Sequence, residues 1–230
     1  MATWVAHLAM AKNLEDKLNI KNKDEFYLGS ILPDLERWVV SDLSILVPYS
    51  ESHYAETVCS NNKEIGEHIN LNKFFNENKN NMSEDIFLGY YSHLIADYYL
   101  NNIFIENLLV YENDECVGII LDNNEVKICS ADQRRIYKHK EYDYFDNYIR
   151  SNMKLDYPKY NKEMLNKVKM FKRFNLSEDD VIKITKEAKN LVTKQKTNKK
   201  YNYEFLSEKR LIQVLKDTEQ YILDTIKKNN

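Results

Sequence analysis

Residues 85–109 read DIFLGYYSHLIADYYLNNIFIENLL, and this stretch does more than any other to decide the expected fold. It is apolar and aromatic and contains no proline, so it is typical of a buried helix. Ser83 precedes it, and Glu84 and Asp85 would lie in the first turn, where a hydroxyl acceptor and negative charge favour helix formation. We therefore predict one long helix that runs through Leu109.

The composition favours helices in the rest of the chain as well. Only 4 glycines and 3 prolines occur among 230 residues, fewer than an all-β or doubly wound protein normally needs for its turns. The hydrophobic share of 43% is enough for a sizeable core. The expected class is all-α, with many helices.

Helical spacing is also visible on the N-terminal side of the central stretch. Five apolar residues near the N-terminus recur at three- and four-residue steps: Trp4, Leu8, Ala11, Leu14 and Leu18. Ile65, Ile69 and Phe74 predict another helix through the sixties and seventies. Between these segments, Pro33 ends a helix or turn and leaves Asp34 in a loop.

The C-terminal side reads in the same way. Helical pattern resumes near Asp132, and after Pro158 the chain is charged and helical. Ser177 and Asp180 have the spacing of a capping box. One face of the predicted last helix contains Leu211, Leu215, Thr218, Ile222 and Ile226. The lysine-rich run 194–200 is interpreted as a solvated linker, with a basic docking patch as the alternative.

Residues 111–128 are the exception to the helical pattern. Two short β-branched runs flank Asp122-Asn123-Asn124, which predicts a small β-hairpin inserted between helices.

Several features bear on location and partners. The N-terminal residues MATWVAHLAMAKNLEDKL lack a basic leading region, and no run is long enough to span a bilayer. Three cysteines without paired spacing favour a reducing compartment, so we expect a cytoplasmic protein. The net charge of −3 gives no clear nucleic-acid patch.

Two polar residues interrupt the central stretch. His93 and Asp97 are four residues apart, so a helix places them on one face. The simplest interpretation is a hydrogen-bonded polar pair in the core. A buried carboxylate nevertheless costs several kcal/mol without a cationic partner, and no lysine or arginine lies within a turn of Asp97. A divalent metal that binds both side chains is the alternative.

Four segments together resemble the zinc-dependent phospholipase C family, an all-helical family related to fungal single-strand-specific nucleases. They are WVAHLAMA (4–11), FYLGSILPD (26–34), SHY (52–54) and DIFLGYYSHLIAD (85–97). The resemblance covers about residues 4 to 100. It implies a multi-helix bundle forming one domain over 1–230, with a metal-site core at 1–150 and a charged helical extension at 159–230.

The resemblance also implies a set of metal ligands. One zinc ion would be held by Asp34, His53, His93 and Asp97. A second would be held by His7 and would share Asp97 as a bridging carboxylate. The family implies one to three zinc ions, and two are expected here.

A third set of ligands matches the family less closely. The family uses a histidine followed by an HxxxE pair, and the corresponding residues here are His139 and Asp143. Asp replaces Glu, and no histidine precedes them after residue 98. An ordinary surface histidine is the alternative interpretation, and Glu141 or Asp146 could substitute as ligands.

Two bound metals would make phosphoester hydrolysis the natural chemistry, because paired cations stabilise phosphoryl charge and lower the pKa of water. Asp34 is the candidate catalytic residue, which would orient the water or accept its proton. The expected substrate is a phosphodiester or a phospholipid. The alternatives are a nuclease-like phosphodiesterase that binds single strands, and a non-catalytic metal-binding protein that acts through a partner.

Overall fold

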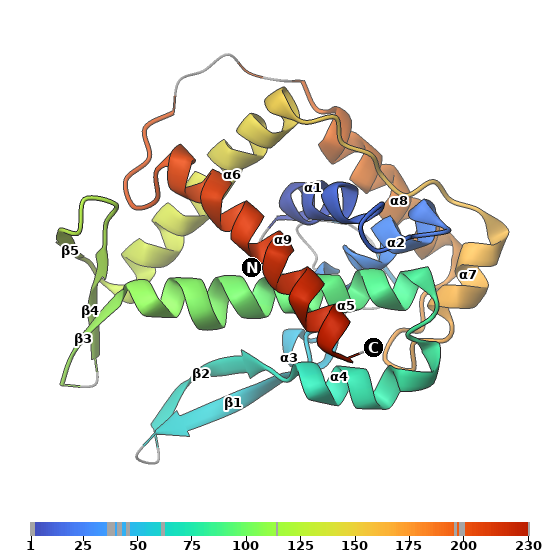
Figure 1. Ribbon diagram of the computed structural model, residues 1–230, viewed down its shortest axis with the longest axis horizontal. Coiled ribbons are helices and arrows are strands. Elements are labelled where there is room, and N and C mark those ends of the chain that lie inside the picture. Colours follow the sequence, from blue (N-terminus) through green and yellow to red (C-terminus); the bar gives the residue numbers. More distant parts are fainter. Residues whose placement is uncertain are drawn as a thin grey trace.

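The computed structural model describes residues 3–35, 40, 43–44, 47–60, 63–113, 115–195, 197 and 201–229, with the backbone alone at 59–60 and 63–66. Helices form most of this part of the chain, so the predicted all-α class is confirmed (Figure 1). The α-helices are α1 (Trp4–Leu14), α2 (Lys23–Gly29), α3 (Tyr49–Ser52), α4 (Leu71–Asn78), α5 (Asp85–Asp97), α6 (Ala131–Asn152), α7 (Lys162–Val168), α8 (Glu178–Thr193) and α9 (Glu208–Asn229). The strands are β1 (Ala55–Ser60), β2 (Lys63–Ile69), β3 (Leu109–Glu112), β4 (Glu115–Ile120) and β5 (Val126–Ile128).

The predicted long helix is present and lies at the centre of the molecule. The helical backbone of α5 continues through a π-helical segment (Tyr98–Ile105) and a 3₁₀ turn (Glu106–Leu108), so the run ends one residue before Leu109. In Figure 1, α9 crosses this green helix while α1 and α4 lie along opposite sides of it. No helix among the described residues is long and apolar enough to cross a membrane.

The start of α5 differs from the prediction. The N-cap is Glu84 rather than Ser83, and no side chain caps the first turn. The Asp85 carboxylate instead accepts backbone N–H groups of Lys21 and Asn22 at 3.0 and 2.6 Å. A tertiary contact therefore replaces the local cap, and it fixes the start of α5 beside the loop that leads into α2.

Two glycines allow α2 and α5 to touch backbone to backbone. A Cβ atom at Gly89 would lie 2.1 Å from the carbonyl oxygen of Phe26, and one at Gly29 would lie 2.0 Å from that of Ile86. Any larger residue would force the two helices apart. This close approach brings the turn that follows α2 beside the middle of α5.

The predicted hairpin near 111–128 is confirmed and has a further strand. Strands β4 and β5 pair antiparallel around the turn that contains Asn124, whose φ is 64°. β3 pairs with the other edge of β4, so the sheet has three strands in the order β3-β4-β5. Cys116 and Cys129, which lie in this region, are both free thiols.

The helix predicted through the sixties and seventies is wrong in its first half. Residues 55–69 form the antiparallel pair β1–β2, and α4 begins only at Leu71. Residues four apart share a face in a strand as well as in a helix, so Ile65 and Ile69 could not distinguish the two. Strand pairing with the β-branched segment around Thr57 and Val58 decides the outcome.

The C-terminal helices pack against the N-terminal ones. The Ser177–Asp180 capping box is confirmed, and α9 packs against α1 and α5. Phe171 stacks on Phe87 of α5 with the ring centroids 4.0 Å apart. The division into a core and an extension stays a prediction, and the predicted linker 194–200 lies mostly outside the described residues.

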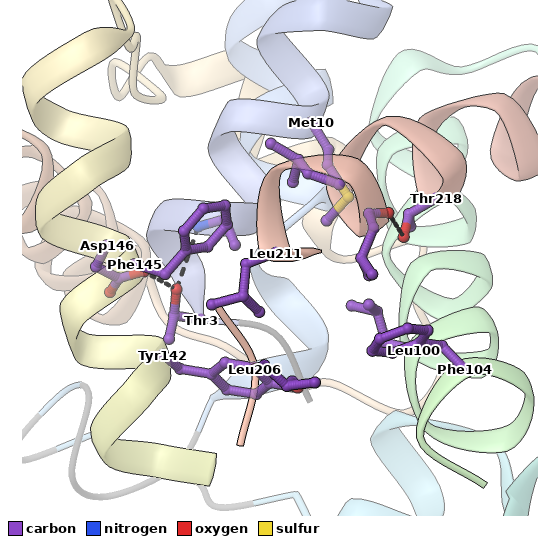
Figure 2. Close-up of a pocket in the computed structure, with 13 residues that line it drawn as sticks. Thr3, Met10, Leu100, Phe104, Tyr142, Phe145, Asp146, Leu206, Leu211 and Thr218 are labelled. Atoms are coloured by element: carbon purple, nitrogen blue, oxygen red, sulfur yellow. Dashed lines mark hydrogen bonds between the residues drawn. The ribbon is translucent and has the colours of Figure 1, made fainter. Parts of the chain in front are cut away.

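A small cavity lies among α1, α6, α9 and the π-helical segment (Figure 2). Its volume is about 30 Å³ and its lining is almost entirely apolar, so it has no room for a substrate. At its edge Asp146 accepts a hydrogen bond from the Thr3 hydroxyl, which also caps α1 by accepting the Ala6 N–H. Burial raises the pKa of Asp146 to about 7, although Thr3 and Arg150 oppose the shift.

We expect Asp146 to make stability fall as pH rises. An unfolded aspartate loses its proton near pH 4, whereas the folded one keeps it to about 7, so the unfolded state binds fewer protons between these values. At roughly 1.4 kcal/mol per pKa unit, Asp146→Asn should remove about 2–4 kcal/mol of this decline. Urea unfolding at pH 5 and pH 8 measures it. Asp143→Asn, an exposed position of the same helix, should leave the decline unchanged, and equal declines in all three proteins would contradict the prediction.

Candidate metal centre

His93 and Asp97 lie on one face of α5, as their spacing predicts, and both are essentially inaccessible to solvent. The Nε2 atom of His93 is 3.7 Å from Oδ2 of Asp97. The two side chains are too far apart for a hydrogen bond, so they do not form a simple bonded pair.

Asp34 reaches the same point from a 3₁₀ turn (Leu32–Asp34) that follows α2. Pro33 fixes the backbone at the start of this turn and ends the preceding helix. The Oδ1 atom of Asp34 lies 3.2 Å from Nε2 of His53 and 3.7 Å from Nε2 of His93. The close contact of α2 with α5 is what places this carboxylate next to His93.

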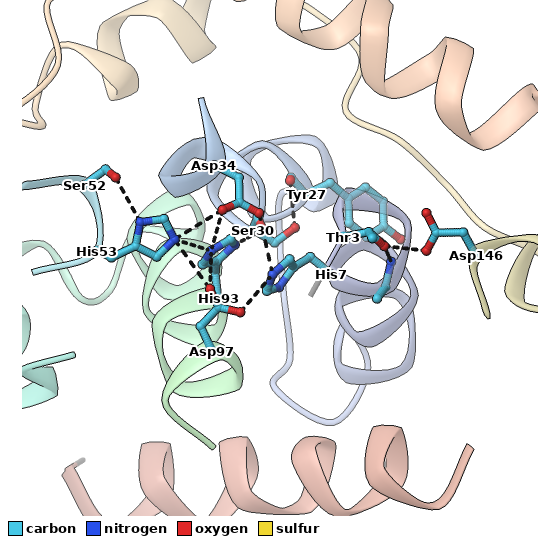
Figure 3. A network of polar contacts seen from close by, with 11 residues as sticks. Thr3, His7, Tyr27, Ser30, Asp34, Ser52, His53, His93, Asp97 and Asp146 are labelled. Atoms are coloured by element: carbon cyan, nitrogen blue, oxygen red, sulfur yellow. Dashed lines mark hydrogen bonds and ion pairs between the residues drawn. The ribbon is translucent and has the colours of Figure 1, made fainter. Parts of the chain in front are cut away.

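His53 completes the group from the end of α3. Its Nε2 atom lies 3.3 Å from that of His93 and 3.5 Å from Oδ2 of Asp97. Figure 3 shows the four side chains converging from three separate elements. Asp34, His53, His93 and Asp97 each offer one atom, and these four atoms lie within 4.8 Å of one another.

The tautomers of the two histidines follow from their other contacts. Nδ1 of His93 lies 2.8 Å from the carbonyl oxygen of Ser30, which can only accept, so this nitrogen carries the proton. Nδ1 of His53 lies 2.9 Å from the Ser52 hydroxyl, which itself donates to the Tyr49 carbonyl. Both Nε2 lone pairs therefore face the centre of the group, as metal-binding imidazoles require.

The Ser52 hydroxyl is expected to matter for metal affinity without being a ligand. Removing it in Ser52→Ala leaves Nδ1 of His53 without its acceptor and loosens the ring orientation. Losing such a supporting contact typically costs about 10–100-fold in metal affinity. Competition with a zinc chelator measures this, and Ser92→Ala, whose hydroxyl bonds only within α5, is the matched control. Equal affinities for the two variants would contradict the expectation.

His7 approaches the group from α1. Its Nε2 atom lies 3.5 Å from Oδ1 of Asp97 and 3.9 Å from Oδ2 of Asp34, and its ring stacks on His93 with the centroids 3.7 Å apart. Both carboxylates thus turn one oxygen toward His53 and His93 and the other toward His7. This is the arrangement that two neighbouring cations sharing carboxylates would need.

The electrostatics of the group favour a cation. Burial would raise the pKa of Asp34, yet His93 and His53 hold it below its ordinary value. Burial would lower the pKa of His53, but the neighbouring Asp34 and Asp97 carboxylates raise it to about 9. Burial lowers the pKa of His93 to about 3, so that imidazole is neutral. Without a metal, a protonated His53 is the cation beside the two buried carboxylates. A divalent ion would displace that proton and leave two carboxylates and two neutral imidazoles, a donor set that suits zinc.

Further observations support the fit. Nε2 of His7 and Oδ1 of Asp34 are buried and have no hydrogen-bond partner in the described part of the molecule. Asp34 has no lysine or arginine within ion-pair distance there, since its partners are the three histidines. Leaving such atoms unmatched is costly, and a metal with nitrogen and oxygen ligands would satisfy them. The residues present therefore fit zinc.

The structure does not bring the residues of the third expected set into this group. His139 and Asp143 are both exposed on α6. Glu141 accepts backbone N–H groups of residues 204, 205 and 206, and Asp146 is bonded to Thr3. Both carboxylates that could have substituted as ligands thus have structural partners elsewhere.

Sequence reasoning missed the supporting contacts around the histidines. The Ser30 carbonyl orients His93, and the Tyr49 ring stacks on His53 with the centroids 4.0 Å apart. Ser52 is adjacent to His53 in the sequence, so it could have been suspected. The Ser30 contact uses a backbone carbonyl, which every residue has, so the sequence could not predict it. The packing of α2 against α5 brings this carbonyl to His93.

Comparison with known protein families agrees with this geometry. The sequence profile described as zinc-dependent phospholipase C matches residues 4–220, which is most of the chain. The chain belongs to the zinc-dependent phospholipase C family. Comparisons with curated proteins and with solved structures found no match. The family membership and the buried Asp-His-His-Asp cluster both support a zinc site.

Proposed function

We propose that this protein is a zinc-dependent phosphoester hydrolase of the phospholipase C type, acting on a phosphodiester or phospholipid. The observation that carries the proposal is the buried group of two imidazole nitrogens and two carboxylate oxygens within 4.8 Å, with His7 adjoining it. Asp34, His53, His93 and Asp97 would hold one ion, and His7 would hold a second with Asp97 shared. Bound zinc supplies Lewis acidity, which stabilises phosphoryl charge and makes water acidic near neutral pH.

The chain's own residues then have separable roles. His93 and His53 are held in fixed orientations by the Ser30 carbonyl and the Ser52 hydroxyl, so their lone pairs need little reorganisation. Asp34 is the proposed catalytic residue. It lies in a turn rather than in a helix, and one carboxylate oxygen can accept the proton of the attacking water while the other stays with the histidines. The water oxygen bonds to phosphorus as the bond to the leaving oxygen breaks.

The experiment combines metal analysis with a substrate panel. Elemental analysis of the purified protein should find about two zinc ions per chain. Hydrolysis is then measured on bis(p-nitrophenyl) phosphate, phosphatidylcholine and single-stranded DNA. Hydrolysis of the first two supports the proposal, whereas preferential hydrolysis of DNA would indicate the nuclease-like alternative. The proposed hydrolase function would be wrong if the folded protein binds no zinc, or if the zinc-loaded protein hydrolyses none of these substrates.

A further inference from the structure

A second, much larger cavity lies beside the candidate metal centre. Its volume is about 480 Å³, which is the size of a small-molecule pocket. The Tyr49 side chain lines it, and the same ring stacks on His53. Asn101, one helical turn beyond Asp97, also lines it. The cavity therefore adjoins the centre through two elements that carry candidate ligands.

One wall of this cavity is cationic. Arg134 and Lys138, one helical turn apart on α6, line it together with Arg135. Nζ of Lys138 donates to Oδ1 of Asn101 at 3.0 Å, so the ammonium is held toward α5. Burial lowers the pKa of Lys138, and the Asp97 carboxylate opposes that shift.

Among the residues that the structure describes, two of these cations have no acidic partner. In the described part of the chain, no carboxylate lies within 4.0 Å of the Lys138 ammonium or the Arg134 guanidinium. Arg135 is paired with Asp132 at 3.8 Å. Nη1 of Arg134 donates to the carbonyls of Cys116 and Cys129 at 3.1 and 3.0 Å, which fix the guanidinium against the small sheet.

The acids that line the cavity do not cancel this charge. The Glu141 carboxylate is engaged by three backbone N–H groups at residues 204–206. Glu67 is exposed. The rest of the lining includes apolar side chains, among them Ile105, Leu109, Ile119 and Leu206. The pocket thus combines a positive wall with an apolar surface.

We propose that this pocket is the substrate's headgroup site, and that it selects a phosphodiester whose headgroup carries an additional anionic group, a phosphate or a carboxylate. This rests on the proposed function for the scissile diester, but the selectivity comes from Lys138 and Arg134. Charge-assisted hydrogen bonds from these two residues would bind the anion. A quaternary ammonium headgroup would meet the aromatic rings of Tyr49 and Phe205 in this pocket, but the two cations would repel it.

The test measures binding with non-hydrolysable probes and the purified, full-length, zinc-containing protein. The probes are phosphonate analogues of dihexanoyl phosphatidylinositol 4-phosphate and dihexanoyl phosphatidylcholine, in which a methylene replaces the leaving-group oxygen. Calorimetry should give a Kd at least tenfold lower for the anionic headgroup. Lys138→Met and Arg134→Met should each reduce this preference to about twofold or less. Lys140→Met is the matched control, because Lys140 lies on α6 but faces Glu204 and does not line the pocket.

Each outcome decides the proposal. Equal Kd values for the two headgroups in the wild type, or an unchanged preference in both variants, would overturn it. A deacylated form of the anionic probe distinguishes the two sources of the headgroup. If it binds as tightly as the lipid probe, the substrate is a soluble diester; if it binds much more weakly, the substrate is a phospholipid. If the wild type hydrolyses bis(p-nitrophenyl) phosphate without headgroup preference, only the pocket proposal fails. If the protein prefers the anionic headgroup but hydrolyses none of the substrates, the proposed hydrolase function is wrong and the proposed binding site is supported.

Discussion

Asp97→Asn is expected to abolish both metal binding at the shared position and hydrolysis, while leaving the protein folded. Asp97 turns Oδ2 toward His53 and Oδ1 toward His7, so in the proposed two-ion site it would be the shared carboxylate. Asparagine has the same shape but offers one oxygen and one NH₂ group, and the latter cannot ligate a cation. Losing several kcal/mol of charge stabilisation corresponds to about a thousandfold in rate or more.

The measurement is zinc content together with the rate on bis(p-nitrophenyl) phosphate. Zinc should fall from two ions per chain to one or fewer. Asp132→Asn, an exposed aspartate on α6, is the matched control and should keep both zinc and activity. Full zinc content and near-normal activity in Asp97→Asn would show that the bridging role is wrong.

Gly89→Ala is expected to prevent stable folding, although alanine is ordinarily the better helix former by about 1 kcal/mol. The added Cβ would lie 2.1 Å from the Phe26 carbonyl oxygen, and this neighbour is backbone rather than a movable side chain. Helices α2 and α5 would have to separate, which opens the backbone contact between them. Overpacking commonly costs 1–3 kcal/mol, and a backbone clash should cost at least about 3.

Urea unfolding and soluble yield measure this second effect. Ser92→Ala, three residues further along α5, removes only a hydroxyl that bonds to the Leu88 carbonyl and should change stability by less than about 1 kcal/mol. The metal centre should be lost along with the fold in Gly89→Ala, because the α2–α5 contact holds Asp34 beside His93. A stable, zinc-binding Gly89→Ala protein would contradict the packing described above.

The two predictions separate chemistry from architecture. Asp97→Asn removes ligand atoms from an intact scaffold, whereas Gly89→Ala disturbs the scaffold without touching a ligand. Zinc content normalised to folded protein distinguishes them, since the first variant should be folded and depleted of metal.

Much of the site could be predicted from the sequence. The pairing of His93 with Asp97 is local, because a four-residue step on a helix always places two side chains on one face. The membership of His7, Asp34 and His53 followed from family resemblance rather than from local pattern. The β1–β2 pair was missed because Ile65 and Ile69 satisfy helical and strand spacing equally well.

The sequence by itself determined the helical class, the buried pair on α5, the 111–128 hairpin and the family. The tertiary structure decided which other polar residues meet that pair and which face of α6 points toward them. From the sequence, His139 was the residue of interest on α6. The structure leaves it exposed and away from the metal centre, and it lines the pocket together with Lys138 and Arg134. Each residue turns a helix by about 100°, so the rotation of α6 about its axis decides which of its side chains reach the cavity. Packing against segments that are distant in the sequence sets that rotation, so it cannot be predicted from the local sequence pattern.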